Sequence, residues 1–237
     1  MATTLFISDL HLSDNTPEIE AGLYALLDRE QGMERLYILG DFFEYWIGDD
    51  DDTPLNRRVI ARLKAVSDSG TKLFIVRGNR DLALGAVFAD QVGGQLLGDT
   101  TVIDLEGTPV LVLHGDTLCT DDVEYLKMRA ILHDPDWQAE MLQRPLSERR
   151  EFAKGLRAAS KEKAENDPDN IIDANDQAIA AAFAEHKVAL MIHGHTHRPD
   201  RHKTADGDRI VLGDWSAEAS WIIRATDGNC QLEQYRY

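Results

Sequence analysis

The chain contains little cysteine. Only Cys119 and Cys230 are present among 237 residues, and their positions form neither a metal-binding nor a redox motif, so we expect reduced thiols in a cytosolic protein. The sequence also lacks any run of about 18 apolar residues, which excludes the usual membrane-spanning helix. The first residues lead directly into an apolar strand pattern, and we therefore expect no signal peptide.

Basic residues are scarce as well. Lys and Arg number 25 against 42 Asp and Glu, which gives a formal net charge of −17. Because a phosphate backbone is bound by a basic face, this balance argues against nucleic acid as the main partner. It also disfavours electrostatic binding to anionic lipid, so that any contact with a membrane would be apolar and local. We expect the protein to be a monomer.

Apolar runs separated by amphipathic segments are abundant. Runs rich in Ile, Val, Leu and Phe predict strands buried on both faces, at residues 5–7, 36–39, 73–76, 110–113 and 189–192. Helical spacing of apolar residues separates the first three runs, and Thr53-Pro54 is typical of a helix start. This alternation predicts an α/β fold with a mostly parallel centre. Later residues predict two hairpins, one over 103–113 and one from Val211 to Ile223.

Residues 121–170, here called the insertion, interrupt this pattern and divide the predicted core into residues 1–120 and 171–237. The insertion has no strand pattern and is dense in Lys, Arg, Glu and Ala, with large apolar residues at loosely helical intervals: Trp137, Met141, Leu142, Leu146, Phe152 and Leu156. One interpretation is a solvated helical hairpin packed on the sheet edge. The other is a cap whose apolar face holds part of a substrate. The acidic run at residues 49–52 is expected to form a solvated loop.

A short polar block follows each of the five apolar runs. The blocks are Asp9-Leu10-His11, Gly40-Asp41, Gly78-Asn79-Arg80-Asp81, His114-Gly115-Asp116 and Gly194-His195-Thr196-His197. Sheets of this kind bind ligands outside the carboxyl ends of their strands, so we expect these side chains to converge on one rim. Alternate residues of an extended strand point to the same side, which pairs Asp9 with His11 and His195 with His197. Gly194 would allow a close approach of the backbone.

These blocks supply a mixed set of carboxylate, carboxamide and imidazole donors. Such a set suits Mn, Fe or Zn better than calcium, which prefers oxygen ligands. A single Asp or His at a strand end is more often a cap or a turn residue, but five blocks in this order favour a metal centre. Seven donors are too many for one ion with open positions and are suited to two, with Asp41 as the shared ligand.

The series of blocks resembles the calcineurin-like metallophosphoesterase superfamily, whose pattern is D-x-H, G-D, G-N-H-[DE], H and G-H-x-H. The match spans essentially the whole chain. It implies a four-layer α/β/β/α sandwich with a helical cap insertion. It also implies two sets of metal ligands, Asp9, His11, Asp41 and His197 for the first ion and Asp41, Asn79, His114 and His195 for the second.

Arg80 departs from this pattern, because most of the superfamily has histidine at that position to protonate an alkoxide leaving group. Arginine stays charged at any useful pH and cannot serve as that acid. It can donate two hydrogen bonds to phosphate oxygens and stabilise developing negative charge. A phosphate leaving group, with a last pKa of about 6, departs without a proton. Arg80 therefore indicates cleavage of a P–O–P linkage.

Longer stretches look like the UDP-2,3-diacylglucosamine pyrophosphatase family of lipid A biosynthesis: residues 40–50 (GDFFEYWIGDD), 78–81 (GNRD), 192–199 (IHGHTHRP) and 212–215 (LGDW). This resemblance implies hydrolysis of UDP-2,3-diacylglucosamine to UMP and 2,3-diacylglucosamine 1-phosphate by a hydroxide that two Mn²⁺ ions per subunit activate. It also implies a peripheral location at the cytoplasmic face of the bacterial inner membrane.

The same resemblance implies roles for individual residues. Asp41, Arg80 and His195 are the implied catalytic residues. The implied substrate contacts are Asn79, Arg80, Asp122, Ser160 and His195. Two further contact positions of the family, usually Asn and Lys, hold Ala164 and Asp167 in this sequence.

Two other functions stay open on the sequence. The first is a soluble metallophosphatase or phosphodiesterase that acts on nucleotides. The second is a scaffold with a relic site, which predicts gaps among the ligand positions, and the sequence has none of these gaps.

Overall fold

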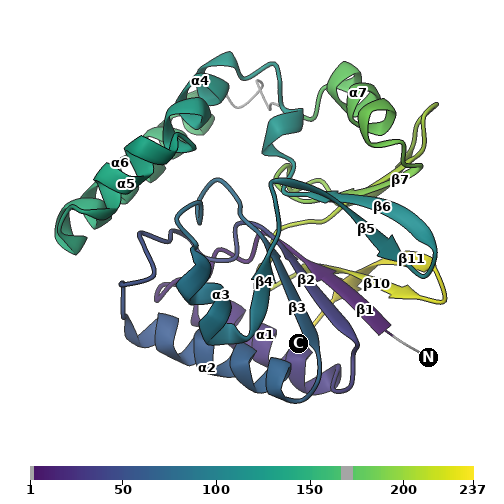
Figure 1. Ribbon diagram of the computed structural model, residues 1–237, viewed down its shortest axis with the longest axis horizontal. Helices are drawn as coiled ribbons and strands as arrows, with labels where there is room; N and C mark the ends of the chain where they lie inside the picture. Colours follow the sequence, from purple (N-terminus) through teal and green to yellow (C-terminus); the bar gives the residue numbers. More distant parts are fainter. Residues whose placement is uncertain (1–2, 167–172) are drawn as a thin grey trace.

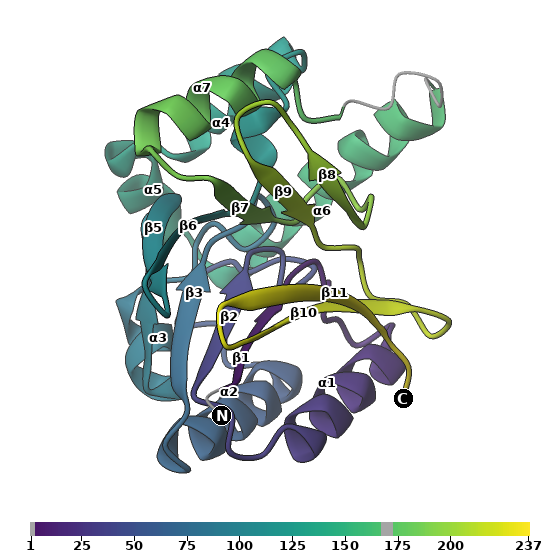
Figure 2. The same ribbon diagram turned by 90° about the vertical axis from the view of Figure 1, so that its right-hand side faces the viewer.

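The computed structural model describes residues 3–166 and 173–237. Within these ranges the chain forms two β-sheets that face each other, with helices on their outer sides (Figures 1 and 2). A separate group of helices stands beyond one edge of the sheets, at the upper left of Figure 1. No described helix combines the length and the apolar composition that a membrane span requires.

The first sheet has six strands with a parallel centre. In spatial order they are β11 (Asn229–Tyr235), β10 (Ser220–Thr226), β1 (Thr3–Ile7), β2 (Arg35–Leu39), β3 (Lys72–Val76) and β4 (Gly94–Leu96). β1 to β4 run parallel, and β10 pairs antiparallel with β1. The predicted strands at 5–7, 36–39 and 73–76 are therefore confirmed.

The second sheet has five strands, again with a parallel centre. In spatial order they are β5 (Thr100–Leu105), β6 (Thr108–Leu113), β7 (Leu190–His193), β9 (Asp208–Val211) and β8 (Asp200–Lys203). The predicted hairpin over residues 103–113 is the β5–β6 pair. The predicted hairpin from Val211 to Ile223 is wrong, because β9 lies in this sheet and β10 lies in the other. Apolar patterns located both strands but carried no information on their partners, which are β7 and β8 for β9 and β1 and β11 for β10.

Alternation along the strands builds four layers. On the outer face of the first sheet, Leu5 and Ile7 pack in one apolar cluster with residues of α1 (Pro17–Arg29), α2 (Pro54–Asp68) and α3 (Ala86–Val92). Phe6 points the other way, into the cluster between the two sheets. On the far side, α7 (Asp176–His186) packs against β6 and β7. The α/β/β/α sandwich expected from the sequence is confirmed, although α7, which is rich in alanine, was not predicted.

The described part of the insertion is helical. It contains α4 (Val123–Leu132), α5 (Pro135–Leu142) and α6 (Leu146–Asn166), and a short 3₁₀ helix, η1 (Asp116–Leu118), precedes it. Asp122 and Asp134 begin α4 and α5 by accepting hydrogen bonds from backbone N–H groups three residues later. The insertion leaves the core after β6 and returns before α7, so it stands beside the carboxyl ends of the central strands.

Candidate metal centre

The polar blocks lie in loops just beyond the strands rather than on the strands themselves. β1 ends at Ile7 and β7 at His193. Asp9, His11, Asp41, His195 and His197 all have positive φ, between 49° and 67°. The expectation that Asp9–His11 and His195–His197 lie along extended strands is therefore wrong. Left-handed backbone costs a non-glycine residue roughly 1–3 kcal/mol and is concentrated at functional sites.

Glycines allow these loops to approach one another closely. A Cβ atom on Gly194 would lie 2.1 Å from Oδ2 of Asp9, and one on Gly78 would lie 2.2 Å from Oδ1 of Asp41. A Cβ on Gly40 would lie 2.5 Å from Nδ1 of His114. These three positions exclude any side chain, as the sequence predicted for Gly194.

One group of donors comes from the loops after β1 and β7. The Nε2 atoms of His11 and His197 are 3.3 Å apart, and Nε2 of His197 is 3.3 Å from Oδ1 of Asp9. Asp9, His11 and His197 each offer a ligand atom, and these atoms all lie within 4.8 Å of one another. This is the predicted first ligand set without its shared member, Asp41.

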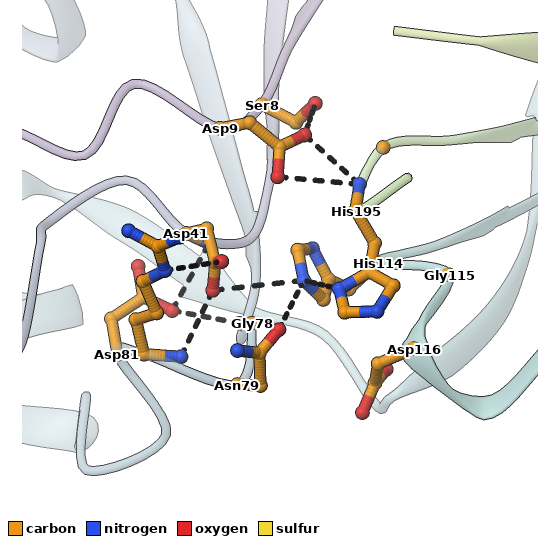
Figure 3. Close-up of polar contacts among 12 residues, drawn as sticks. Ser8, Asp9, Asp41, Gly78, Asn79, Asp81, His114, Gly115, Asp116 and His195 are labelled. Carbon is orange, nitrogen blue, oxygen red and sulfur yellow. Dashed lines mark hydrogen bonds and ion pairs between the residues drawn. The ribbon is translucent and has the colours of Figure 1, made fainter. Parts of the chain in front are cut away.

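A second group comes from the loops after β3, β6 and β7. Nε2 of His114 lies 2.9 Å from Oδ1 of Asn79 and 3.1 Å from Nδ1 of His195 (Figure 3). Asp41 lies between the two groups: its Oδ1 is 3.6 Å from Nε2 of His114, and its Oδ2 is 4.0 Å from Nδ1 of His11. The structure thus brings all seven predicted ligands together, with the Asp41 carboxylate in the position that a shared ligand needs.

Burial and neighbouring charges act in opposite directions on the pKa values of this cluster, and burial prevails at Asp41, His195 and His11. It raises the pKa of Asp41 to about 6 and lowers the pKa of His195 to about 4 and that of His11 to about 2. Burial also acts to lower the pKa of His114, but the carboxylates of Asp41 and Asp9 outweigh it and raise that pKa to about 9. The neighbouring carboxylates therefore favour a positive charge at this position.

The residues present fit a divalent cation. Imidazole nitrogen atoms about 3 Å apart share the space with buried carboxylates, and Nδ1 of His11 is buried without a hydrogen-bond partner. A cation would supply the positive charge that His114 otherwise carries, and would release its proton. Oxygen and imidazole donors in this ratio suit first-row transition metals.

Asp81 fixes the loops that carry this centre. Its buried carboxylate accepts hydrogen bonds from the backbone N–H groups of Phe42 and Gly78, both at 2.7 Å, and a longer one of 3.3 Å from Asp41. One side chain therefore ties the loop after β2 to the loop after β3.

Arg80 lies beside Asp41 at the edge of the centre. Its backbone N–H donates to Oδ1 of Asp41 at 2.9 Å, and its Nε lies 3.4 Å from Oδ2 of the same carboxylate. Its Nη1 donates to Oε2 of Glu44 at 2.6 Å. Sequence reasoning missed Glu44, because a glutamate between aromatic residues matches no ligand pattern.

The predicted substrate contacts of the insertion lie on its helices. Asp122 is the N-cap of α4, and Ser160 is exposed near the end of α6. Ala164 belongs to the same helix, and Asp167 lies outside the described residues. The substrate-binding roles of Asp122 and Ser160 stay predictions.

A cavity of about 310 Å³ separates the centre from the insertion. Asn79 and Arg80 line it, and its large apolar lining residues come from both sides, namely Trp46, Ile47, Leu82, Leu84, Leu132, Trp137, Met141, Leu142, Phe152 and Leu156. Five of the six large apolar residues predicted to form a wall are present, and Leu146 is the exception. This shared cavity favours the cap interpretation of the insertion over a hairpin packed on the sheet edge.

The acidic run at residues 49–52 is only in part the solvated loop expected from the sequence, because Asp50 and Asp52 are exposed but Asp51 is buried and Asp49 is half-buried. Asp49 accepts hydrogen bonds from the backbone N–H groups of Gly85 and Phe88. Asp50 forms a two-fold ion pair with Arg149, at 2.8 and 2.5 Å. Asp51 pairs with Arg150 at 2.7 Å. The run therefore anchors α6 to the core.

The other end of the insertion is anchored in the same way. Arg129 of α4 donates to Asp116 at 2.6 Å and to Asp99 at 2.7 Å. Asp116 also accepts a 2.6 Å hydrogen bond from the Tyr125 hydroxyl. Ion pairs thus hold to the core the helices that line the outer side of the cavity.

Comparisons with known proteins agree with this geometry. The family model for calcineurin-like phosphoesterases matches residues 2–199. A UDP-2,3-diacylglucosamine hydrolase of Marinobacter nauticus is 48% identical over 93% of this chain and 92% of its own length. The proteins of the same name from Cellvibrio japonicus and Escherichia coli are 45% and 44% identical, over 98% and 99% of both chains.

Among solved structures, an archaeal phosphodiesterase has the same fold. Its TM-score is 0.52 at 12% identity, over 98% of this chain and 99% of its own. At that identity the likeness concerns the fold alone. The family model and the full-length relatives lead to one conclusion: the chain belongs to the calcineurin-like phosphoesterase family and, within it, to the UDP-2,3-diacylglucosamine hydrolases.

Proposed function

We propose that this protein hydrolyses the diphosphate of UDP-2,3-diacylglucosamine to UMP and 2,3-diacylglucosamine 1-phosphate, in lipid A biosynthesis. The observation that carries the proposal is a mostly apolar cavity that reaches the metal centre. Asn79 and Arg80 line the cavity and belong to the loop that enters the centre, and most of its other lining residues are apolar, with Arg77, Gln138 and Arg149 as the polar ones. A substrate with a diphosphate at one end and acyl chains at the other matches both parts. The names of the relatives agree with this assignment.

The cofactor in this proposal is a pair of Mn²⁺ ions. Asp9, His11, Asp41 and His197 would hold one ion, and Asp41, Asn79, His114 and His195 the other. When bound, the ions would activate water and neutralise negative charge at the phosphorus. The support for two ions is the position of Asp41 between two groups of donors, and the support for manganese is the mixture of oxygen and imidazole ligands.

Arg80 gives the proposal its preference for a diphosphate. A guanidinium carries five N–H groups, and the contacts with Glu44 and Asp41 occupy two of them. The other N–H groups of Arg80 could donate hydrogen bonds to phosphate oxygens. These bonds would bring positive charge to the oxygens on which negative charge develops during the reaction. Since a departing phosphate needs no proton, the permanently charged arginine serves the reaction without acting as an acid.

The cavity wall would take up acyl chain. Burial of apolar surface contributes roughly 25 cal/mol per Å², so about 100 Å² of buried chain would contribute about 2.5 kcal/mol to binding. We place the protein at the cytoplasmic face of the bacterial inner membrane, as a peripheral monomer, because the acyl chains of its substrate partition into lipid. Several apolar side chains of the insertion are exposed and suit a local apolar contact: Val123, Met128, Ile131 and Leu142.

A paired assay tests this function. Purified protein is supplied with Mn²⁺ and either UDP-2,3-diacylglucosamine or UDP-N-acetylglucosamine, and release of UMP is measured. We expect turnover of the diacylated substrate to exceed that of the soluble one by at least about 100-fold in kcat/KM, since two chains must leave water. Equal turnover of both would favour a soluble nucleotide phosphodiesterase. Absence of any Mn²⁺-dependent hydrolysis would favour a scaffold with a relic site.

A further inference from the structure

Glu44 occupies a position that joins the core to the insertion. Its Oε2 accepts a hydrogen bond of 2.6 Å from Nη1 of Arg80, and its Oε1 accepts one of 2.5 Å from Nε of Arg157, on α6. The side chains of Arg80 and Glu44 are only 17% and 23% exposed, so this pair is poorly screened by water. One carboxylate therefore contacts both the arginine beside the metal centre and a helix of the cap.

The backbone holds Glu44 and Arg80 side by side. The N–H of Glu44 donates to the carbonyl of Leu12, and the N–H of Trp46 donates to the carbonyl of Arg80. The loop after β2 is thereby tied to the loops after β1 and β3. Because both loops are fixed, the direction of the Arg80 guanidinium depends on its side-chain partners.

Of the two carboxylates beside Arg80, Glu44 is the one that the metal centre does not need. Asp41 lies between the two donor groups, and a metal ion would compete with Arg80 for its oxygens. Glu44 lies on the outer side, with its nearer oxygen 3.9 Å from Nδ1 of His11. A carboxylate that keeps its hydrogen bond while Asp41 is engaged can hold a guanidinium in one orientation.

Arg157 lies next to the part of α6 that lines the cavity. Phe152, Ala153 and Leu156 contribute to the wall, and Arg157 follows directly. An acyl chain that fills the cavity would contact this stretch of α6 and would constrain Arg157 beside it. Together Arg80, Glu44 and Arg157 carry a net charge of +1, so the trio still attracts a diphosphate.

We propose that Glu44 is a positioning residue for Arg80, and that its contact with Arg157 makes the orientation of Arg80 depend on acyl chain in the cavity. This inference rests on the proposed function, because Arg80 must meet the diphosphate of a diacylated substrate. It predicts that part of the binding energy of the acyl chains raises kcat instead of lowering KM.

The test is a double-mutant cycle on UDP-2,3-diacylglucosamine hydrolysis, with Glu44→Gln, Arg157→Gln and the double variant. Glu44→Gln is expected to lower kcat about tenfold without raising KM, because loss of a carboxylate cannot weaken attraction for an anionic substrate. Arg157→Gln is expected to lower kcat about threefold in the wild-type background and less than about twofold when Gln already replaces Glu44. Arg157 is 38% exposed, so its substitution leaves the packing intact.

Arg150→Gln is the matched control, because Arg150 also ties α6 to a core aspartate but does not touch Glu44. Its effect on kcat is expected to be the same in both backgrounds. An unchanged kcat in Glu44→Gln, or an Arg157→Gln effect of equal size in both backgrounds, would overturn the inference while the proposed function stands. A wild-type protein that does not hydrolyse the diacylated substrate overturns the proposed function itself.

Discussion

The metal centre and the insertion are held in place by different interactions. Around the centre, strands with fully buried residues such as Phe6 and Ile7 end in tight loops, and glycines let those loops touch. In the insertion, α4 and α5 contain no buried residue, and ion pairs with Asp50, Asp51 and Asp116 attach the helices to the core. Apolar packing fixes geometry closely, whereas ion pairs near the surface contribute less and respond to solvent. In the proposed function, the chemistry would thus take place on the tightly packed part and substrate capture on the part held by ion pairs.

Removal of Asp41 should give the largest effect on the tightly packed part. In Asp41→Ala, turnover is expected to fall by at least about a thousandfold, because both donor groups lose their shared carboxylate. Bound Mn²⁺, measured by elemental analysis after gel filtration, should fall as well. A folded variant with full metal content and wild-type activity would contradict the role of Asp41 as a shared ligand.

A pair of glycine substitutions compares the two regions directly. Gly194→Ala places a methyl group 2.1 Å from Oδ2 of Asp9, so we expect a loss of about 1–3 kcal/mol in the free energy of unfolding. Gly155→Ala lies in α6, where a Cβ has no neighbour within 4 Å, and should stabilise that helix by roughly 0.5–1 kcal/mol. Urea unfolding of both variants measures the two changes in the free energy of unfolding. Equal changes would contradict the difference in packing between the two regions.

Arg149→Met tests how the insertion is attached. Arg149 is only 4% exposed and forms the two-fold ion pair with Asp50. Its loss is expected to weaken attachment of α6 by about 1–2 kcal/mol, because Asp50 is exposed and can be solvated alone. Hydrogen exchange should therefore accelerate in α4 to α6 and stay unchanged in β1 to β3. Faster exchange throughout the chain would indicate that the two regions are not held separately.

Acidification tests an ion pair within the core, and we expect the smallest effect there. Arg224 donates two hydrogen bonds to Glu30, and these bonds lower the pKa of Glu30. Since the folded-state pKa is depressed, the stabilisation is complete above the unfolded value of about 4.3 and is lost as pH falls through the folded value. The difference in unfolding free energy between wild type and Glu30→Gln should shrink by at most about 1 kcal/mol between pH 6 and pH 3.5. A difference in unfolding free energy that does not change with pH would contradict the lowered pKa of Glu30.

The sequence predicted those features of the structure that depend on local residue patterns and on one topological rule, namely that ligands bind outside the carboxyl ends of the strands of such a sheet. Strands, the first helices and the seven clustered donors follow from apolar runs and from polar residues just after them. The pairing of β10 with β1 was not predictable, because it joins residues far apart in the chain. Glu44, Arg129 and Arg149 were missed for another reason: a charged residue that forms an ion pair has the same local pattern as one in water. The left-handed backbone of Asp9 and His11 agrees with the preference of Asp and His for this region, but both residues are also common in ordinary turns, so residue type alone did not predict it.

The two chain segments that border the insertion lie side by side. The backbone N–H of Asn175 donates to the carbonyl of Leu118 at 2.8 Å, and its side chain donates to Asp121. A segment whose entry and exit points already touch can be lengthened, shortened or exchanged without moving the strands on either side. Enzymes built on this scaffold could therefore acquire new substrates by replacing one contiguous stretch of gene while the hydrolytic machinery is inherited intact.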